Sequence, residues 1–103
     1  MLKFFKTMED GKIDRLETYE EGCWVDLVNP TDDEIDDVFA LTAVPEEMLK
    51  AALDEEETAR FERDEDMFLC LLDTPIITDM EDGDVYETIP MAIIDNKKCI
   101  VTV

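Results

Sequence analysis

Apolar residues recur along the chain with two different spacings, which predict where strands and helices lie. Residues 23–28 are rich in β-favouring side chains and have the alternation of a strand. Ile35, Val38 and Phe39 then have the spacing of a helix that packs on one side. A second helical stripe follows, made of Met48, Leu49, Ala52 and Leu53. We therefore predict helices over residues 31–41 and 45–53.

Seven segments have the pattern of strands: 2–7, 13–19, 23–28, 59–63, 67–77, 85–94 and 99–103. The apolar run at residues 67–72 predicts a central strand that is buried on both faces. Pro75 predicts a bulge or an edge-facing position in that strand. The element order is β-β-β-α-α-β-β-β-β. We expect an α+β fold, a mixed and mainly antiparallel sheet with a helical hairpin on one face.

Short motifs mark the joints between these elements. Pro30 ends the third strand, and Thr31 with Glu34 forms the S/T-x-x-E capping box that begins a helix. Pro45 occupies a predicted first helical position. Gly11 follows Asp10 between two predicted strands, which is a strong hairpin signal.

The second face of the predicted sheet has no segment to cover it. Apolar strands normally need cover on both sides. We expect either that this chain is part of a longer protein or that it covers the face by weak self-association.

The charge of the chain restricts its partners. Its 103 residues predict a single domain, 1–103, with 29 acidic and 9 basic residues, a formal charge of −20 and no histidine. This balance argues against nucleic acid and anionic membranes, which attract basic clusters. It is compatible with cations or a basic protein as partners, and also with acidic side chains that only solvate the surface.

The side chains for common catalytic chemistry are missing from the pattern. Cys23, Cys70 and Cys99 each lie in an apolar, strand-like run, which predicts free thiols in a reducing compartment. Without histidine, a Cys-x-x-Cys pair or a glycine-rich phosphate loop, we expect no enzyme. Trp24 and Asp26 share one face of their strand, where Trp24 is either a core residue or a ligand platform.

Three stretches resemble the amino-terminal cytosolic domain of CorA-type divalent-cation transporters, and the similarity covers essentially the whole chain. They are EEGCWVDLVNPTDDEI, VPEEMLKAALDEEETARFE and VYETIPMAIIDNKKCIVTV. The resemblance implies a cytosolic regulatory domain that precedes stalk helices, two membrane helices and a Gly-Met-Asn motif. It also implies a homopentamer that carries magnesium, cobalt or nickel into the cytoplasm and is closed by magnesium bound between cytosolic domains.

The stalk, the pore and the Gly-Met-Asn motif are not in this sequence. We therefore expect a truncated piece at the cytoplasmic face of the membrane that does not itself transport and is a monomer or a weak oligomer. Its expected partners are divalent cations and the rest of the transporter chain. The alternatives are a free-standing acidic module that binds a basic protein, and the cytosolic domain of a zinc-transporting relative.

The resemblance also locates a regulatory metal site, but this sequence departs from it. Family members carry an adjacent Glu-Asp pair where this chain has Lys50 and Ala51, which cannot coordinate magnesium. One turn later comes a run of carboxylates that could bind Mg²⁺ weakly with partners from the stalk: Asp54, Glu55, Glu56 and Glu57. The alternative is that this run only ends the helix and stays hydrated.

Overall fold

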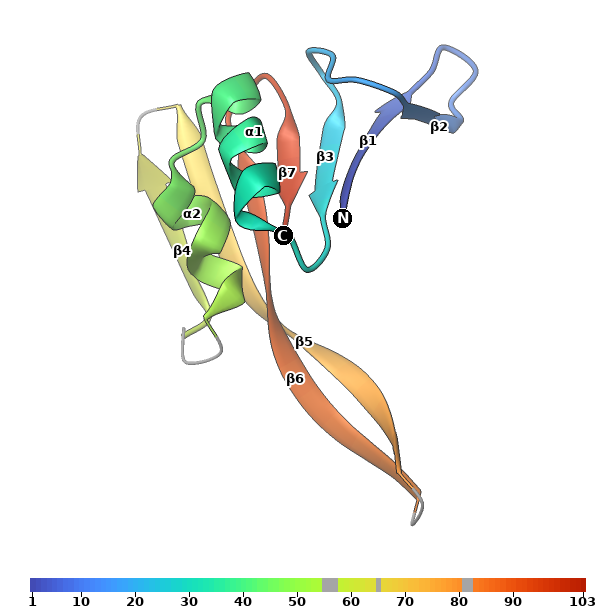
Figure 1. Ribbon diagram of the computed structural model, residues 1–103, viewed down its shortest axis with the longest axis vertical. Helices are drawn as coiled ribbons and strands as arrows, with labels where there is room; N and C mark the ends of the chain where they lie inside the picture. The colour runs from blue at the N-terminus through green and yellow to red at the C-terminus, as the bar shows by residue number, and fades with distance from the viewer. Residues whose placement is uncertain (55–57, 65, 81–82) are drawn as a thin grey trace.

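A computed structural model describes residues 1–54, 58–64, 66–80 and 83–103 of the chain (Figure 1). In these residues one seven-stranded sheet carries two short helices and a 3₁₀ turn. The strands are β1 (Leu2–Thr7), β2 (Ile13–Leu16), β3 (Trp24–Leu27), β4 (Arg60–Asp64), β5 (Met67–Met80), β6 (Gly83–Asp95) and β7 (Ile100–Thr102). The helical elements are α1 (Asp32–Thr42), α2 (Glu46–Lys50) and the 3₁₀ turn η1 (Ala51–Leu53). The predicted α+β class and element order are confirmed.

The strand order across the sheet is β2-β1-β3-β7-β6-β5-β4. The pair β3–β7 is parallel, whereas the other neighbours are antiparallel. The sheet thus has an amino-terminal half and a carboxy-terminal half that meet at β3 and β7. A tight turn joins β1 to β2, and Gly11 has the φ of +83° that this turn needs.

The helices lie on one face of the sheet and enclose the core with it (Figure 1). The buried core side chains come from both layers: Cys23, Val25, Leu27, Ile35, Val38, Val44, Leu49, Ala51, Ala52, Leu69, Leu71, Ala92, Ile94, Cys99 and Val101. Ile35 and Val38 are buried as predicted. Phe39 was predicted to lie on the same packed face of the helix, but that prediction is wrong, because Phe39 is 47 % exposed. Thr42 takes the third buried position of α1, and its hydroxyl donates to the carbonyl of Val38 over 2.7 Å.

The second predicted helix has two geometries. Pro45 is the N-cap of α2 and not its first helical residue, so α2 begins at Glu46, one residue later than predicted, and it ends at Lys50. The chain then tightens into η1, where the Asp54 N–H reaches the Ala51 carbonyl at 3.4 Å. Such 3₁₀ turns are frequent at helix ends, because they satisfy carbonyls that an α-helix leaves unpaired.

The predicted central strand is not central. β5 is the second strand from one edge, and β7 occupies the middle of the sheet. Leu69 and Leu71 are buried under the helices, but Leu72 on the other face is 41 % exposed. The prediction of burial on both faces is therefore wrong, because helices cover only one side.

Beyond the body of the sheet, β5 and β6 continue as a long two-stranded ribbon (Figure 1). Among the described residues, β4 pairs with β5 only as far as Leu71, and β7 pairs with β6 only at residues 93–95, so no described strand pairs with the outer edges of the ribbon. Pro75 opposes Thr88 and Pro90 opposes Asp73, so both prolines occupy the same class of ladder position. Because proline has no N–H to donate, both ring nitrogens face away from the partner strand, towards edges with which no described strand pairs, in line with the edge-facing position predicted for Pro75.

Candidate functional site

The predicted metal-binding run begins at the end of the helical layer. Asp54 is exposed directly after η1, whereas Glu55, Glu56 and Glu57 lie outside the described residues. Lys50 Nζ lies 3.8 Å from Glu46 Oε2 one turn earlier, and Ala51 is buried in the core. The two positions that replace the expected acidic pair therefore hold an ion-paired ammonium group and a buried methyl group.

Two carboxylates from different helices meet in front of the sheet. Asp36 of α1 is hydrogen-bonded to Glu46 of α2, and this contact, together with desolvation and the negative charges of Asp36 and Asp32, raises the pKa of Glu46. The positive charge of Lys50 opposes the shift. A proton or a cation between two neighbouring carboxylates relieves the repulsion between their charges.

No local sequence pattern indicates this carboxylate pair. The two residues are ten positions apart, and only the antiparallel arrangement of α1 and α2 brings them together. Within the described parts of the chain, no group of three or more Asp, Glu, Cys or His side chains is arranged to hold a metal ion.

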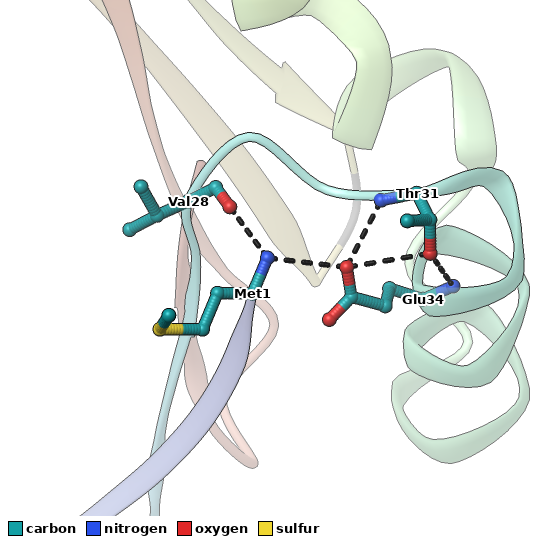
Figure 2. A network of polar contacts seen from close by, with 4 residues as sticks. All are labelled: Met1, Val28, Thr31 and Glu34. Carbon is teal, nitrogen blue, oxygen red and sulfur yellow. Dashed lines mark hydrogen bonds and ion pairs between the residues drawn. The ribbon is translucent and has the colours of Figure 1, made fainter.

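The capping box ties the start of α1 to the amino terminus of the chain (Figure 2). Glu34 Oε1 accepts from the Thr31 N–H at 3.0 Å and from the Met1 ammonium group at 3.1 Å. The Thr31 hydroxyl oxygen accepts from the Glu34 N–H at 3.2 Å, and the Met1 ammonium group also donates to the Val28 carbonyl at 2.6 Å. The backbone N–H of Thr31 and the positive amino terminus lower the pKa of the Glu34 carboxyl.

The open face of the sheet carries a row of side chains that crosses all seven strands. The register places them side by side in the order Arg15, Phe5, Trp24, Ile100, Asp95, Phe68 and Arg63. The rings of Phe5 and Trp24 are in contact, with centroids 5.0 Å apart. Apart from Asp95, this row is apolar between its two basic ends, Arg15 and Arg63, in contrast to the acidic remainder of the molecule.

Trp24 belongs to the open face and not to the core. Trp24 is 39 % exposed, and its indole N–H donates to Thr102 Oγ1 over 2.8 Å. The Thr102 hydroxyl in turn donates to Asp26 Oδ1 over 2.8 Å. The expectation that Trp24 and Asp26 share a face is confirmed, and the carboxylate is partly buried and hydrogen-bonded.

A cavity of about 500 Å³ lies beside Trp24. Phe5 and Trp24 form part of its wall, and it is lined by three of the molecule's nine basic residues, Lys6, Lys97 and Lys98. Lys6 pairs with Glu20 at 3.2 Å and Lys97 with Asp66 at 3.0 Å. The open face is thus where basic and aromatic groups of this acidic protein come together.

Comparison with protein families gives a match to the CorA-like Mg²⁺ transporter protein family over residues 19–103. The chain belongs to the CorA family. The resemblance noted in the sequence is confirmed by a match that covers most of the chain. A comparison with curated proteins gives no match.

Two solved CorA structures from Methanocaldococcus jannaschii have the same fold. The soluble domain of that CorA matches 99 % of this chain with a TM-score of 0.77 and 20 % identity, and this chain covers 39 % of it. The complete CorA magnesium transporter matches 99 % of this chain with a TM-score of 0.71 and 24 % identity, and this chain covers 31 % of it. The chain therefore spans well under half the length of either CorA chain.

Among the described helices of this CorA-family chain, none has both the length and the apolar character needed to cross a bilayer. Its longest helix, α1, has 11 residues, whereas a span needs about 20.

Proposed function

We propose that this chain is the regulatory cytosolic domain of a CorA-like transporter, and that it responds to divalent cations without transporting them itself. The observation that carries the proposal is the CorA family match over residues 19–103. The role is one of binding and regulation and not of catalysis. The rest of the transporter chain, with its stalk and membrane helices, is the partner on which the domain acts, within a homopentamer.

The acidic helical layer supports a response to cations. The first turn of α1 carries Asp32, Asp33 and Glu34. Further along α1, Asp36 shares a hydrogen bond with Glu46 at the start of α2. At a formal charge of −20, folding concentrates negative charge on a small body and destabilises it at low ionic strength. Divalent cations relieve that repulsion more effectively than monovalent ones at equal ionic strength when carboxylates are close enough to share them.

We further propose that Mg²⁺ is bound by the carboxylate run of Asp54, Glu55, Glu56 and Glu57. Magnesium keeps several of its waters and uses few carboxylates, which a loose acidic run supplies. Lys50 and Ala51 offer no ligand atom, so binding to this chain alone is weak, with a dissociation constant on the order of millimolar. Carboxylates from the remainder of the transporter would complete the site.

The test is the melting temperature of the chain in 10 mM MgCl₂ against sodium chloride of matched ionic strength. Binding of that strength stabilises the fold by about 1.4 kcal/mol, or roughly 5–10 °C in melting temperature. The variant Asp54→Asn/Glu55→Gln/Glu56→Gln/Glu57→Gln is expected to lose the excess of magnesium over sodium. Calcium is expected to act similarly, because few ligands give little geometric selectivity.

A matched control separates a local site from a general charge effect. Glu9→Gln/Asp14→Asn/Glu17→Gln/Glu21→Gln removes the same kinds and number of carboxylates near β2, at the opposite edge of the sheet from β4. This control is expected to keep the magnesium excess. If both variants lose it equally, the response is diffuse screening, and if the unmodified chain shows no excess, the regulatory proposal for this run is wrong. The same titration with Zn²⁺ tests the zinc-transporting alternative, which predicts tighter binding of zinc than of magnesium.

A further inference from the structure

Two cysteines occupy equivalent positions at the junction between the halves of the sheet. Cys23 directly precedes β3 and Cys99 directly precedes β7. Trp24 and Ile100 are opposite each other in the parallel register, and the Ile100 N–H donates to the Cys23 carbonyl over 3.2 Å. Continuing that register by one residue places Cys23 opposite Cys99.

The two thiols also point to the same side of the sheet. Cys23 alternates with the buried Val25, and Cys99 alternates with the buried Val101, so both side chains face the helical layer. Cys23 is 2 % exposed and Cys99 is 5 % exposed. Neighbouring strands lie about 4.8 Å apart, which is within the span of about 4.4–6.8 Å between the Cα atoms of a disulfide.

The surroundings of Cys99 slow its reaction with an oxidant. Burial raises the pKa of the Cys99 thiol, and the proximity of Cys23 raises it further, against the effect of a hydrogen bond from Tyr19. Cys99 Sγ donates to Asn96 Oδ1 over 3.4 Å. Protonated thiols are poor nucleophiles, so exchange at this pair is slow and requires local opening.

A bond between Cys23 and Cys99 would connect the two halves of the sheet. β3 and β7 are paired over only three residue pairs, and this short parallel ladder joins the β2-β1-β3 half to the β7-β6-β5-β4 half. A bond between Cys23 and Cys99 connects positions 76 residues apart, and so restricts the unfolded chain strongly.

We propose that Cys23 and Cys99 form a reversible disulfide that locks the two halves of the sheet together under oxidising conditions. One thiolate attacks a low-molecular-weight disulfide, forms a mixed disulfide and releases one thiol. The second protein thiolate then attacks the protein sulfur of that mixed disulfide, and the second small thiol leaves. Two electrons and two protons pass from the protein thiols to the small disulfide, which is reduced to two thiols.

The experiment uses the Cys70→Ser variant, because Cys70 lies on the open face and would otherwise report intermolecular chemistry. The variant is incubated for hours with oxidised glutathione, and free thiols are then counted in denaturant. The count is expected to fall from two to zero. Trypsin without reductant should release residues 16–50 linked to residues 99–103, since cleavage follows Arg15, Lys50 and Lys98.

Oxidation is also expected to raise the melting temperature by on the order of 10 °C, and dithiothreitol should reverse the rise. Cys70→Ser/Cys23→Ser, which keeps only Cys99, should show neither the linked peptide nor the rise. Two free thiols after oxidation, linkage only between molecules, or a lower melting temperature in the cross-linked form would each overturn the proposal. The thiol count of the Cys70→Ser variant needs no replacement of Cys23, so it tests the proposal even if that replacement impairs folding.

Discussion

At the scale of single residues, polar contacts with local partners decide where elements begin. Thr31 and Glu34 satisfy each other's backbone N–H groups, so the start of α1 depends on two side chains three positions apart. The Met1 ammonium group also donates to the same carboxylate oxygen, over 3.1 Å. This network is exposed, and its contribution therefore depends on hydrogen bonds more than on charge.

Replacing Thr31 with alanine removes the acceptor for the Glu34 N–H. The free energy of unfolding is expected to fall by about 1 kcal/mol, as measured by urea denaturation at pH 7. Thr58→Ala serves as the control, because Thr58 is exposed outside any helix or strand. Equal stabilities of the two variants would show that the capping box contributes nothing.

The same network predicts a pH dependence. The pKa of Glu34 is below its usual 4.5 in the folded state, so the native state binds fewer protons there than the unfolded state. The stabilisation is fully present above the unfolded pKa and is lost as the pH falls through the folded pKa. The stability advantage of the unmodified chain over Glu34→Gln should shrink as urea titrations move from pH 6 to pH 3; a constant difference would contradict this.

The pKa of Glu46 is shifted in the opposite direction, so its effect has the opposite sign. A raised carboxyl pKa means that the folded state favours the protonated form, and stability is lost as the pH rises through the folded pKa. Glu46→Gln, which keeps the size and can still donate to Asp36, should melt higher than the unmodified chain at pH 7. At pH 4 that gain should shrink, and a gain that is independent of pH would argue against the shared proton.

On the open face, Thr102 links Trp24 to Asp26. Thr102→Val preserves the shape but leaves the indole N–H and a partly buried carboxylate without this partner. We expect a loss of about 1–2 kcal/mol in the free energy of unfolding, together with a change in tryptophan fluorescence. Thr7→Val on the exposed end of β1 is the control and should stay within about 0.5 kcal/mol; a similarly small effect at Thr102 would show that the hydrogen-bonded chain is not stabilising.

At the scale of elements, the β5–β6 ribbon combines long strands with open edges. Open edges offer N–H and C=O groups to other strands, and proline is one of the residues that blocks them. Pro75 lies four residues beyond Leu71, the last residue of β5 that pairs with β4, and Pro90 lies three residues before Ile93, where the pairing of β6 with β7 begins. Each proline removes one N–H group from the edge that it occupies, which opposes the addition of a strand there.

Replacing both prolines with threonine restores two edge donors. Pro75→Thr/Pro90→Thr is expected to aggregate through its ribbon at concentrations where the unmodified chain stays in solution, as measured by light scattering over time. Ile77→Thr, which changes an exposed ribbon residue without adding a donor, is the control. Aggregation of the double variant no faster than that of the control would contradict this role.

At the scale of the whole molecule, the apolar open face favours association of two copies, whereas the net charge opposes it. The face carries exposed Trp24, Phe61, Leu72 and Ile100, and such patches usually mark an interface. The formal charge of −20 repels identical copies. Because salt screens repulsion between exposed charges, self-association should be weak and should increase with salt concentration.

Sedimentation velocity at rising sodium chloride concentrations measures this balance. Phe61→Gln on the open face is expected to reduce association, whereas Phe39→Gln, at an exposed position on the helical side, should leave it unchanged. A monomer at high protein and high salt concentrations would show that the open face does not bind a second copy.

The amino-acid sequence by itself determined those features that depend on neighbours within a few residues. The capping box, the Gly11 hairpin, the two helical segments and the chain order of the strands were predicted because caps, turns and periodicity act locally. The family resemblance was also readable, because it rests on linear motifs. The candidate metal run remains a prediction, since three of its four residues lie outside the described part of the chain.

Only the tertiary structure decided which segments meet over long distances. The parallel β3–β7 pair put β7 in the middle of the sheet, moved β5 towards an edge and left Leu72 exposed. The helical packing turned Phe39 outward and brought Asp36 to Glu46. An apolar run does not specify its neighbours, because the burial it gains depends on how strands and helices from the whole chain share the available faces.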